Sequence, residues 1–410
     1  MNSFFSRLAA LAVAGLCAIA SGCGGDSSSD AGVGTGGSGY AVGTITGFGS
    51  VIVDGIAWDD TGARVQFEGG PLAGSTPTLK IGQRVRIEYE TAPIARIIEI
   101  APAAVGPVQI AAAGTVPRLR IAGQTVQVNL SDATQPVTIL DGYTSVAAIA
   151  AGDLVEVHGQ PVLAGDTYVL RATRIERLAG APTPAPGPAP TPTPVPPQRV
   201  QNVVQDYNAA ARTLRLGDVT VSVATATIEP AGATIANGRT VTVVARPAPA
   251  GAPTDLVAES VRVLDLSTNT KPSELSGTVS RFDATNRSFE LAGVRVNAAD
   301  ASVVPGGEPI ANGATVVVRG SFRPDGSFDA TQVRIRKKGE TPDFAYDVSL
   351  TGRIGAFASL ADFRVRGQRV DASKAELRSC AGVQFRNGLE VEIGGAIVGD
   401  KVVAEVLTCR

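Results

Sequence analysis

The chain has 410 residues, with 47 glycines, 26 prolines and only 5% aromatic residues. This composition favours many short strands joined by turns and disfavours long helices. The formal net charge of −2 lacks the basic excess of nucleic-acid-binding proteins, so we expect no nucleic-acid partner.

The first segment has the features of an export signal. Within residues 1–22, Arg7 precedes an apolar stretch from Leu8 to Ala20 that is too short to span a bilayer comfortably. The stretch ends in Ala-Ser-Gly-Cys at residues 20–23, which resembles the lipobox of bacterial lipoproteins. The resemblance implies that residues 1–22 are a signal peptide and that Cys23 carries a lipid anchor. The alternative is an ordinary secretory signal with Cys23 as a bystander.

Residues 23–40 are rich in Gly and Ser, which indicates a flexible tether. Such a tether would hold a folded body away from a lipid surface. Residue 24 is Gly rather than Asp, which by the lipoprotein sorting rule implies the outer membrane. We therefore expect an exported protein that is anchored to the cell envelope through its N-terminal lipid.

The rest of the chain contains five copies of one pattern. A strand beginning near Gly43 or an equivalent residue opens each copy, an alternating strand follows a Gly, and another alternating strand closes the copy. Gly238, Gly313 and Gly388 are spaced by 75 residues, and earlier copies have Gly82 and Gly152 at the same point. Period-two alternation is typical of half-buried strands.

These repeats predict an all-β fold of five tandem small antiparallel β-barrels. We expect each barrel to be OB-like, with about five or six strands in roughly 60–70 residues. A Pro-rich stretch over residues 180–199 predicts a semi-rigid linker after the second barrel. The expected barrels cover residues 41–101, 104–179, 200–265, 274–338 and 348–410.

The clearest motif lies in the first copy. It reads GTITGFGSVIVDGIAWD over residues 43–59, and LKIGQRVRI and ARIIEI follow it. Asp54-Gly55 is a hairpin-turn dipeptide between apolar runs. This stretch resembles the bacterial domain of unknown function 5666, and the first copy resembles it most. The resemblance implies a small β-barrel in the cell envelope and implies no particular activity.

The cysteines predict one disulfide. Cys17 would leave with the signal and Cys23 would be lipidated, which leaves Cys380 and Cys409 in the last copy. An exported protein meets an oxidising compartment, so we expect these two to pair. A metal or redox pair is the alternative, but no C-x-x-C spacing is present.

The chain offers few groups for catalysis. Its single histidine, His158, ends an alternating strand, where a structural role is more common than a catalytic one. One histidine cannot form a His-cluster zinc site, and no nucleophile elbow, P-loop or dinucleotide motif accompanies it. We therefore expect no enzyme activity, no metal and no cofactor.

One loop of the first copy is a candidate ligand site. Trp58, the only tryptophan, precedes Asp59 and Asp60, and an aromatic beside two acids could bind a sugar or a cation. A solvated loop beside a core aromatic is the alternative.

We thus expect a non-catalytic envelope lipoprotein whose repeated barrels bind or assemble with an envelope protein or polysaccharide. Glycan binding around Trp58 is a second hypothesis, and an envelope hydrolase is a third and weaker one.

Overall fold

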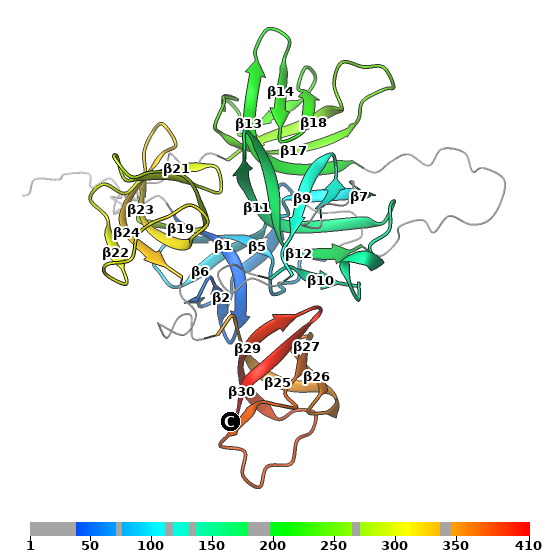
Figure 1. The fold of residues 1–410 in the computed structure, drawn as a ribbon, viewed down its shortest axis with the longest axis vertical. Helices are drawn as coiled ribbons and strands as arrows, with labels where there is room; N and C mark the ends of the chain where they lie inside the picture. Colours follow the sequence, from blue (N-terminus) through cyan, green and yellow to red (C-terminus); the bar gives the residue numbers. More distant parts are fainter. Residues whose placement is uncertain are drawn as a thin grey trace, which may run out of the picture. The chain divides into compact units, whose positions relative to one another are not determined.

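The computed structural model describes residues 38–70, 76–110, 118–130, 137–178, 197–264, 271–336 and 346–410. The predicted signal peptide, Cys23 and most of the predicted tether and linker lie outside the described residues. Within the described ranges the secondary structure consists of strands and one short 3-10 turn, η1 (Val146–Ala148), so the expected all-β fold is confirmed (Figure 1).

Each copy contributes six strands in the described residues. Copy 1 has β1 (Gly39–Phe48), β2 (Val51–Val53), β3 (Ile56–Trp58), β4 (Arg64–Phe67), β5 (Arg84–Tyr89) and β6 (Ala95–Ile100). Copy 2 has β7 (Ala104–Ile110), β8 (Arg118–Ile121), β9 (Gln124–Val128), β10 (Ile139–Asp141), β11 (Leu154–Ala164) and β12 (Thr167–Arg177).

Copies 3 to 5 repeat the series. Copy 3 has β13 (Gln198–Asn208), β14 (Thr213–Leu216), β15 (Val219–Ser222), β16 (Thr227–Glu229), β17 (Thr240–Pro247) and β18 (Leu256–Val263). Copy 4 has β19 (Ser273–Asp283), β20 (Ser288–Leu291), β21 (Val294–Asn297), β22 (Ser302–Val304), β23 (Thr315–Phe322) and β24 (Phe328–Ile335). Copy 5 has β25 (Val348–Ser359), β26 (Asp362–Val365), β27 (Gln368–Asp371), β28 (Glu376–Arg378), β29 (Glu390–Val398) and β30 (Lys401–Cys409).

In two copies the first strand extends into the stretch expected to be tether or linker. β1 begins at Gly39, inside the stretch assigned to the tether, and β13 begins at Gln198, inside the stretch assigned to the linker. Both extensions pair with a neighbouring strand, Gly39 with Tyr89 and Gln198 with Ala245. Backbone pairing, rather than composition, therefore sets where these copies begin.

The strands of each copy pair in a closed ring, in which the fifth strand pairs back with the first. In copy 3, β13 pairs with β14, β14 with β15, β15 with β18, β18 with β17, and β17 with β13. Copies 2, 4 and 5 have the same ring of pairings, and in every ring the third and last strands are parallel. Copy 1 closes through a single parallel bridge between Asp59 and Ile94. A closed ring satisfies the edge strands that an open sheet would leave unpaired.

The landmark glycines have one structural role in all five copies. Each has a positive φ of 83–89°, a conformation that glycine adopts without strain. Each donates its backbone N–H to a carbonyl of the first strand of its copy, over 2.8–2.9 Å. The donors are Gly82, Gly152, Gly238, Gly313 and Gly388, and the acceptors are Ile45, Val108, Val204, Val279 and Ile354.

Copies 3 to 5 add a second repeated bond. The Oδ1 atoms of Asn237, Asn312 and Asn387 accept the backbone N–H of an aromatic residue 30 positions earlier, each over 2.8 Å. The asparagine therefore ties the loop before the fifth strand to the first strand of its copy.

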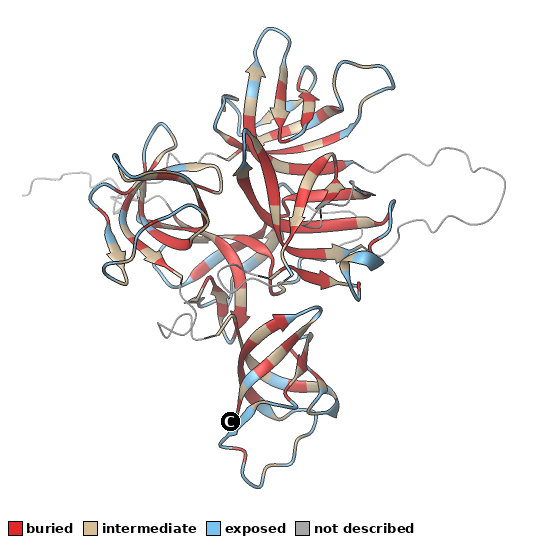
Figure 2. Cartoon of the chain, viewed as in Figure 1, coloured by how far each residue is buried: buried red, intermediate tan, exposed pale blue. Residues whose placement is uncertain are grey.

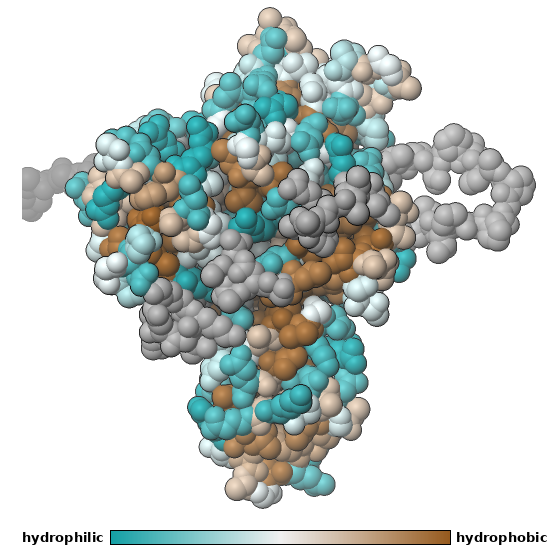
Figure 3. Space-filling model, viewed as in Figure 1, coloured by the Kyte–Doolittle hydropathy of each residue, from teal (hydrophilic) through white to brown (hydrophobic). Residues whose placement is uncertain are grey.

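The buried side chains form three clusters that do not follow chain order. The first joins copies 1 and 5, the second joins copies 2 and 3, and the third fills copy 4 and contacts Tyr40 and Val42 of copy 1. Buried positions alternate along the strands, whereas exposed positions gather in the loops (Figure 2). On the face in Figure 3, hydrophilic residues cover much of the surface and hydrophobic residues gather in smaller areas between them.

Candidate functional site

The motif of copy 1 is the place where other copies attach. Asp54 and Gly55 form the tight turn between β2 and β3, and both have positive φ, at 46° and 85°. The buried Asp54 carboxylate accepts the N–H of Thr44 at 2.7 Å and a short hydrogen bond from the Ser276 hydroxyl of copy 4. A Cβ on Gly43 would lie 2.4 Å from Asp54 Oδ2 and 2.5 Å from Ser276 Oγ, so only glycine permits this approach.

The second part of the motif attaches copy 5. Gly47 and Phe48 of β1 pair in parallel with Ser349 and Leu350 of β25. A Cβ on Gly47 would lie 2.2 Å from the Ser349 carbonyl oxygen. The glycine in this Gly-Phe-Gly-Ser stretch is therefore explained by a contact between copies, because a side chain would force the two strands apart.

A buried ion pair attaches copy 3. Arg199 Nη2 lies 2.6 Å from Glu68 Oε2, and Arg199 Nη1 donates to the Glu68 carbonyl at 2.7 Å. Gln201 Nε2 donates to the same carboxylate at 3.1 Å. Burial lowers the pKa of Arg199, and the nearby Glu68 opposes this effect. The pair needs both members, since removing one would leave a buried charge without compensation.

His158 of copy 2 belongs to the same junction. Its buried ring accepts the backbone N–H of Arg84 on Nδ1 at 3.2 Å, and its Nε2 lies 2.7 Å from Glu156 Oε1. Because Nδ1 is an acceptor, Nε2 carries the proton and donates to Glu156. Burial acts to raise the pKa of Glu156, but the His158 hydrogen bond and nearby positive charges lower it overall. Both ring nitrogens are therefore occupied by structural bonds, as the sequence analysis favoured.

Arg84 links three copies. Its Nη2 donates to the Ser276 carbonyl of copy 4 at 2.9 Å, while its backbone N–H binds His158. Burial lowers the pKa of this guanidinium, and the nearby Asp54 opposes the shift. Copy 1 thus holds polar or backbone contacts with each of the other four copies.

Trp58 does not form an exposed binding face. Its side chain is only 1% exposed and packs on Tyr89, with ring centroids 4.8 Å apart, so it cannot stack on a sugar. The hypothesis of a glycan site on this ring is corrected accordingly. Asp59 is exposed, and its Oδ1 accepts the N–H of Thr61 at 2.9 Å, which lowers its pKa. Asp60 lies beside it in the same loop and is half-buried.

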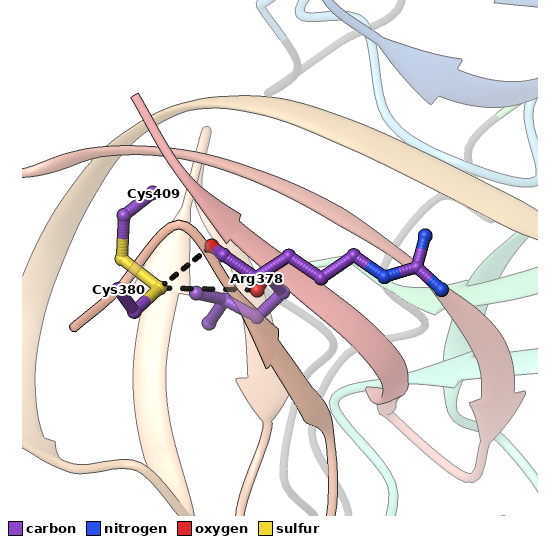
Figure 4. The surroundings of a disulfide bond; sticks show 4 residues. Arg378, Cys380 and Cys409 are labelled. Carbon is purple, nitrogen blue, oxygen red and sulfur yellow. Dashed lines mark hydrogen bonds between the residues drawn. A yellow bond between two sulfur atoms is a disulfide. The ribbon is translucent and has the colours of Figure 1, made fainter.

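The expected cysteine pair is present. Cys380 and Cys409 form a disulfide with Sγ atoms 2.11 Å apart and Cα atoms 5.1 Å apart (Figure 4). The bond joins the segment after β28 to the end of β30. Cys380 Sγ also lies 3.1 Å from the Arg378 carbonyl oxygen, a contact without a proton because the sulfur is oxidised. Cys23 lies outside the described residues.

Two features are absent from the described part of the chain. No group of three or more His, Cys, Asp or Glu residues there could hold a metal ion. None of its helical segments is long and apolar enough to cross a bilayer.

The family "Domain of unknown function (DUF5666)" matches residues 105–176 and 276–334. These two segments make up about a third of the chain, and over them the chain is similar to DUF5666 proteins. The two matched segments are copies 2 and 4, whereas the motif that suggested the family lies in copy 1. Both matched copies have the closed ring of pairings described above.

Other comparisons add little. No curated protein matches this chain. A solved structure, "drosophila Unr CSD456", is 13% identical, covers 57% of this chain and 96% of its own, and has a TM-score of 0.13. A likeness at that score supports no argument about this chain.

Proposed function

We propose that each copy is an OB-like barrel. The support is the order of pairing, in which the first strand meets the second, the second the third, the third the last, the last the penultimate, and the penultimate the first. The short extra strand, such as β16, pairs beside the last strand in parallel. OB-like barrels commonly bind ligands through loops and one strand face.

We further propose that the chain is a non-catalytic lipoprotein of the cell envelope. Cys23 would carry the lipid, and the barrels would form a body that binds or assembles with an envelope protein or polysaccharide. One observation carries this proposal: copy 1 contacts every other copy through buried or backbone bonds, including Asp54–Ser276 and Glu68–Arg199. A chain that joins its repeats in this way can present several loops together, which suits a multivalent binding surface.

The enzymatic alternative has less support. His158 would be the natural general base, but both of its ring nitrogens are engaged in the buried junction. A hydrolase would therefore have to use carboxylates alone. Glycan binding remains compatible with the proposal, although it would have to use loops other than the buried Trp58 ring.

In-cell photocrosslinking would test the proposal. A photoreactive residue would replace exposed Ala210, Thr285 or Ala361, which lie between the first and second strands of copies 3, 4 and 5. The proposal expects one dominant protein or polysaccharide partner in the envelope fraction. The Cys23→Ser chain would lose both the anchor and the partner.

Two outcomes would contradict the proposal. One is crosslinking no greater than in the Cys23→Ser control at all three loops. The other is turnover of an envelope substrate that a single substitution abolishes.

A further inference from the structure

A hollow lies where copies 1, 2 and 5 meet. Its volume is about 330 Å³, within the roughly 300–1,000 Å³ typical of small-molecule sites. Side chains from β1, β12, β26 and β27 contribute to its wall, together with the segment before β5. The charged or aromatic members that matter most are Phe48, Lys80, Arg174, Arg364, Arg366 and Arg369.

Three of these cations are neutralised by carboxylates. Arg174 and Lys80 both pair with Asp141 and with Glu176. Arg369 pairs with Asp362 at 2.9 Å and with Asp400 at 3.4 Å.

The other two arginines bind only backbone oxygens or a ring among the described residues. Arg364 Nη1 donates to the Gly367 carbonyl at 2.8 Å. Arg366 donates to the Thr351 carbonyl at 3.0 Å and to the Gly49 carbonyl at 3.3 Å, and its guanidinium lies 5.9 Å from the centroid of the Phe48 ring. Carbonyls orient a guanidinium without neutralising it. The five cations here meet four carboxylates, so one net positive charge remains, and neither Arg364 nor Arg366 forms an ion pair of its own among the described residues.

In copies 3 and 4 the residue equivalent to Arg364 takes part in an ion pair. In copy 3 the equivalent Arg215 makes the same kind of bond to its turn, donating to the Gly217 carbonyl at 3.0 Å. That arginine also pairs with Asp206 at 2.6 Å. In copy 4 the charges are exchanged, and Arg281 pairs with Glu290 at 3.2 Å.

Copy 5 keeps only one member of this pair. Asp206, Arg281 and Ala356 are spaced by 75 residues and share a positive φ of 46–52°, so they are equivalent positions. The residue opposite Arg364 at this place is therefore an alanine. Copies 3 and 4 both have an ion pair at these two positions, with the positive and negative residues exchanged. Copy 5 has only the positive residue, Arg364.

The rest of the wall is mixed, with Thr78, Gln368 and the paired Asp141 and Asp400 beside apolar side chains. Phe48, Ile81 and Ile139 line the hollow and are 3–6% exposed. A ligand that fits both parts needs an acidic group for the guanidiniums and an apolar body for this surface.

We propose that this hollow binds a small organic anion, with its carboxylate or phosphate held by Arg364 and Arg366. The site depends on neither the lipid anchor nor a protein partner, so it goes beyond the function proposed above. Planar guanidiniums can hold a carboxylate or phosphate through paired hydrogen bonds.

Calorimetric titration of the full chain in detergent tests the site. The probes are two organic anions, phenyl phosphate and benzoate. Benzyl alcohol has the same aromatic ring without a charge, and inorganic phosphate has the charge without a ring. We expect one of the two organic anions to bind, and both benzyl alcohol and inorganic phosphate to bind at least tenfold more weakly. The head group that binds better identifies whether carboxylates or phosphate esters are the ligands.

The repeats supply matched variants. Arg364→Gln removes one positive charge, and Ala356→Asp restores the partner that copy 3 has, so each should weaken binding of the organic anion about tenfold. Arg215→Gln removes the equivalent turn bond far from the hollow and should leave binding unchanged. Ala356→Asn has the size of aspartate without its charge and should also bind normally.

The proposal is overturned if neither organic anion binds at millimolar concentration, or if Arg364→Gln and Ala356→Asp bind as the unaltered chain does. Equal binding of benzyl alcohol would overturn it too, because binding would then be purely apolar. An equal loss in the Ala356→Asn control would indicate a steric effect and would also count against it. Any partition of a probe into the detergent is the same for every variant, so it does not affect the comparison between variants.

Discussion

Copy 1 and copy 5 have the same strand order but are stabilised in different ways. Copy 1 closes its ring through a single bridge at Asp59 and has buried charged groups, including Glu68 and Arg84, that bind other copies. Copy 5 has full pairing between its third and last strands and an internal disulfide. The comparison teaches that one repeat can be stabilised from outside, by its neighbours, or from inside, by a covalent link.

The two copies are nevertheless joined. Their buried side chains form one cluster, and their strands β1 and β25 pair in parallel. A change in either copy should therefore be felt in the other, and the size of the effect should depend on which kind of stabilisation is removed.

The largest effect should follow from breaking the outside support of copy 1. Glu68→Ala leaves Arg199 buried without its carboxylate, and we expect the free energy of unfolding to fall by about 3–5 kcal/mol. Urea denaturation measures this. Glu259→Ala is the control, because its pair with Arg246 is exposed and should change stability by no more than ~1 kcal/mol. Equal effects of the two substitutions would show that the buried Glu68–Arg199 pair contributes no more to stability than an exposed pair.

A somewhat smaller effect should follow from breaking the inside support of copy 5. Replacing Cys380 and Cys409 by alanine removes a crosslink spanning 29 residues, and we expect a loss of about 3–4 kcal/mol from loop-closure entropy. Denaturation with and without a reducing agent measures it. The reductant should destabilise the unaltered chain and leave the double variant unchanged. A reductant effect that persists in the double variant would contradict this assignment.

The smallest effect should be the pH dependence contributed by Glu99 of copy 1. Burial acts to raise the pKa of this carboxyl, but Arg86 and the hydrogen bond from Gln66 lower it below its ordinary value of 4.5. The unfolded state therefore binds the proton more readily, so the contribution is present above the unfolded pKa and is lost as pH falls through the folded one. Denaturation midpoints at pH 7 and pH 3.5 should differ less in Glu99→Gln than in the unaltered chain.

The exposed Glu392 provides a matched control for this measurement. It pairs with Arg410 on the surface of copy 5, where solvent weakens the interaction. Glu392→Gln should leave the pH dependence nearly unchanged. If Glu392→Gln reduced the difference between the two midpoints as much as Glu99→Gln does, the burial of Glu99 would not be the cause of its effect.

The sequence was sufficient for features that repeat. The 75-residue spacing of Gly238, Gly313 and Gly388 predicted equivalent turns, and the structure gives all three the same bond to the first strand. Local chemistry was equally informative at Asp54-Gly55, where only residues tolerant of positive φ fit the turn. The pairing of Cys380 with Cys409 followed from elimination and the expected compartment.

The sequence was insufficient for features that occur once. Glu68 and Arg199 are separated by 131 positions, and no periodicity relates a single acid to a single base so far apart. The burial of Trp58 agrees with the alternative that the sequence offered, a core aromatic beside a solvated loop, and Trp58 faces Val51 across the hairpin. Ala356 follows Asp206 at the 75-residue spacing, but Arg364 lies one position short of it, so only the strand register shows that Arg364 is equivalent to Arg215.

The parallel pairing of β1 has a consequence for biosynthesis. Gly47 and Phe48 leave the ribosome about 300 residues before Ser349 and Leu350, the partners that cover them. At ~5–20 residues per second, this part of the strand edge waits roughly 15–60 s for its partner. During that interval the newborn chain exposes backbone donors and acceptors that another strand could occupy, so the cell must keep nascent copies apart until the last repeat emerges.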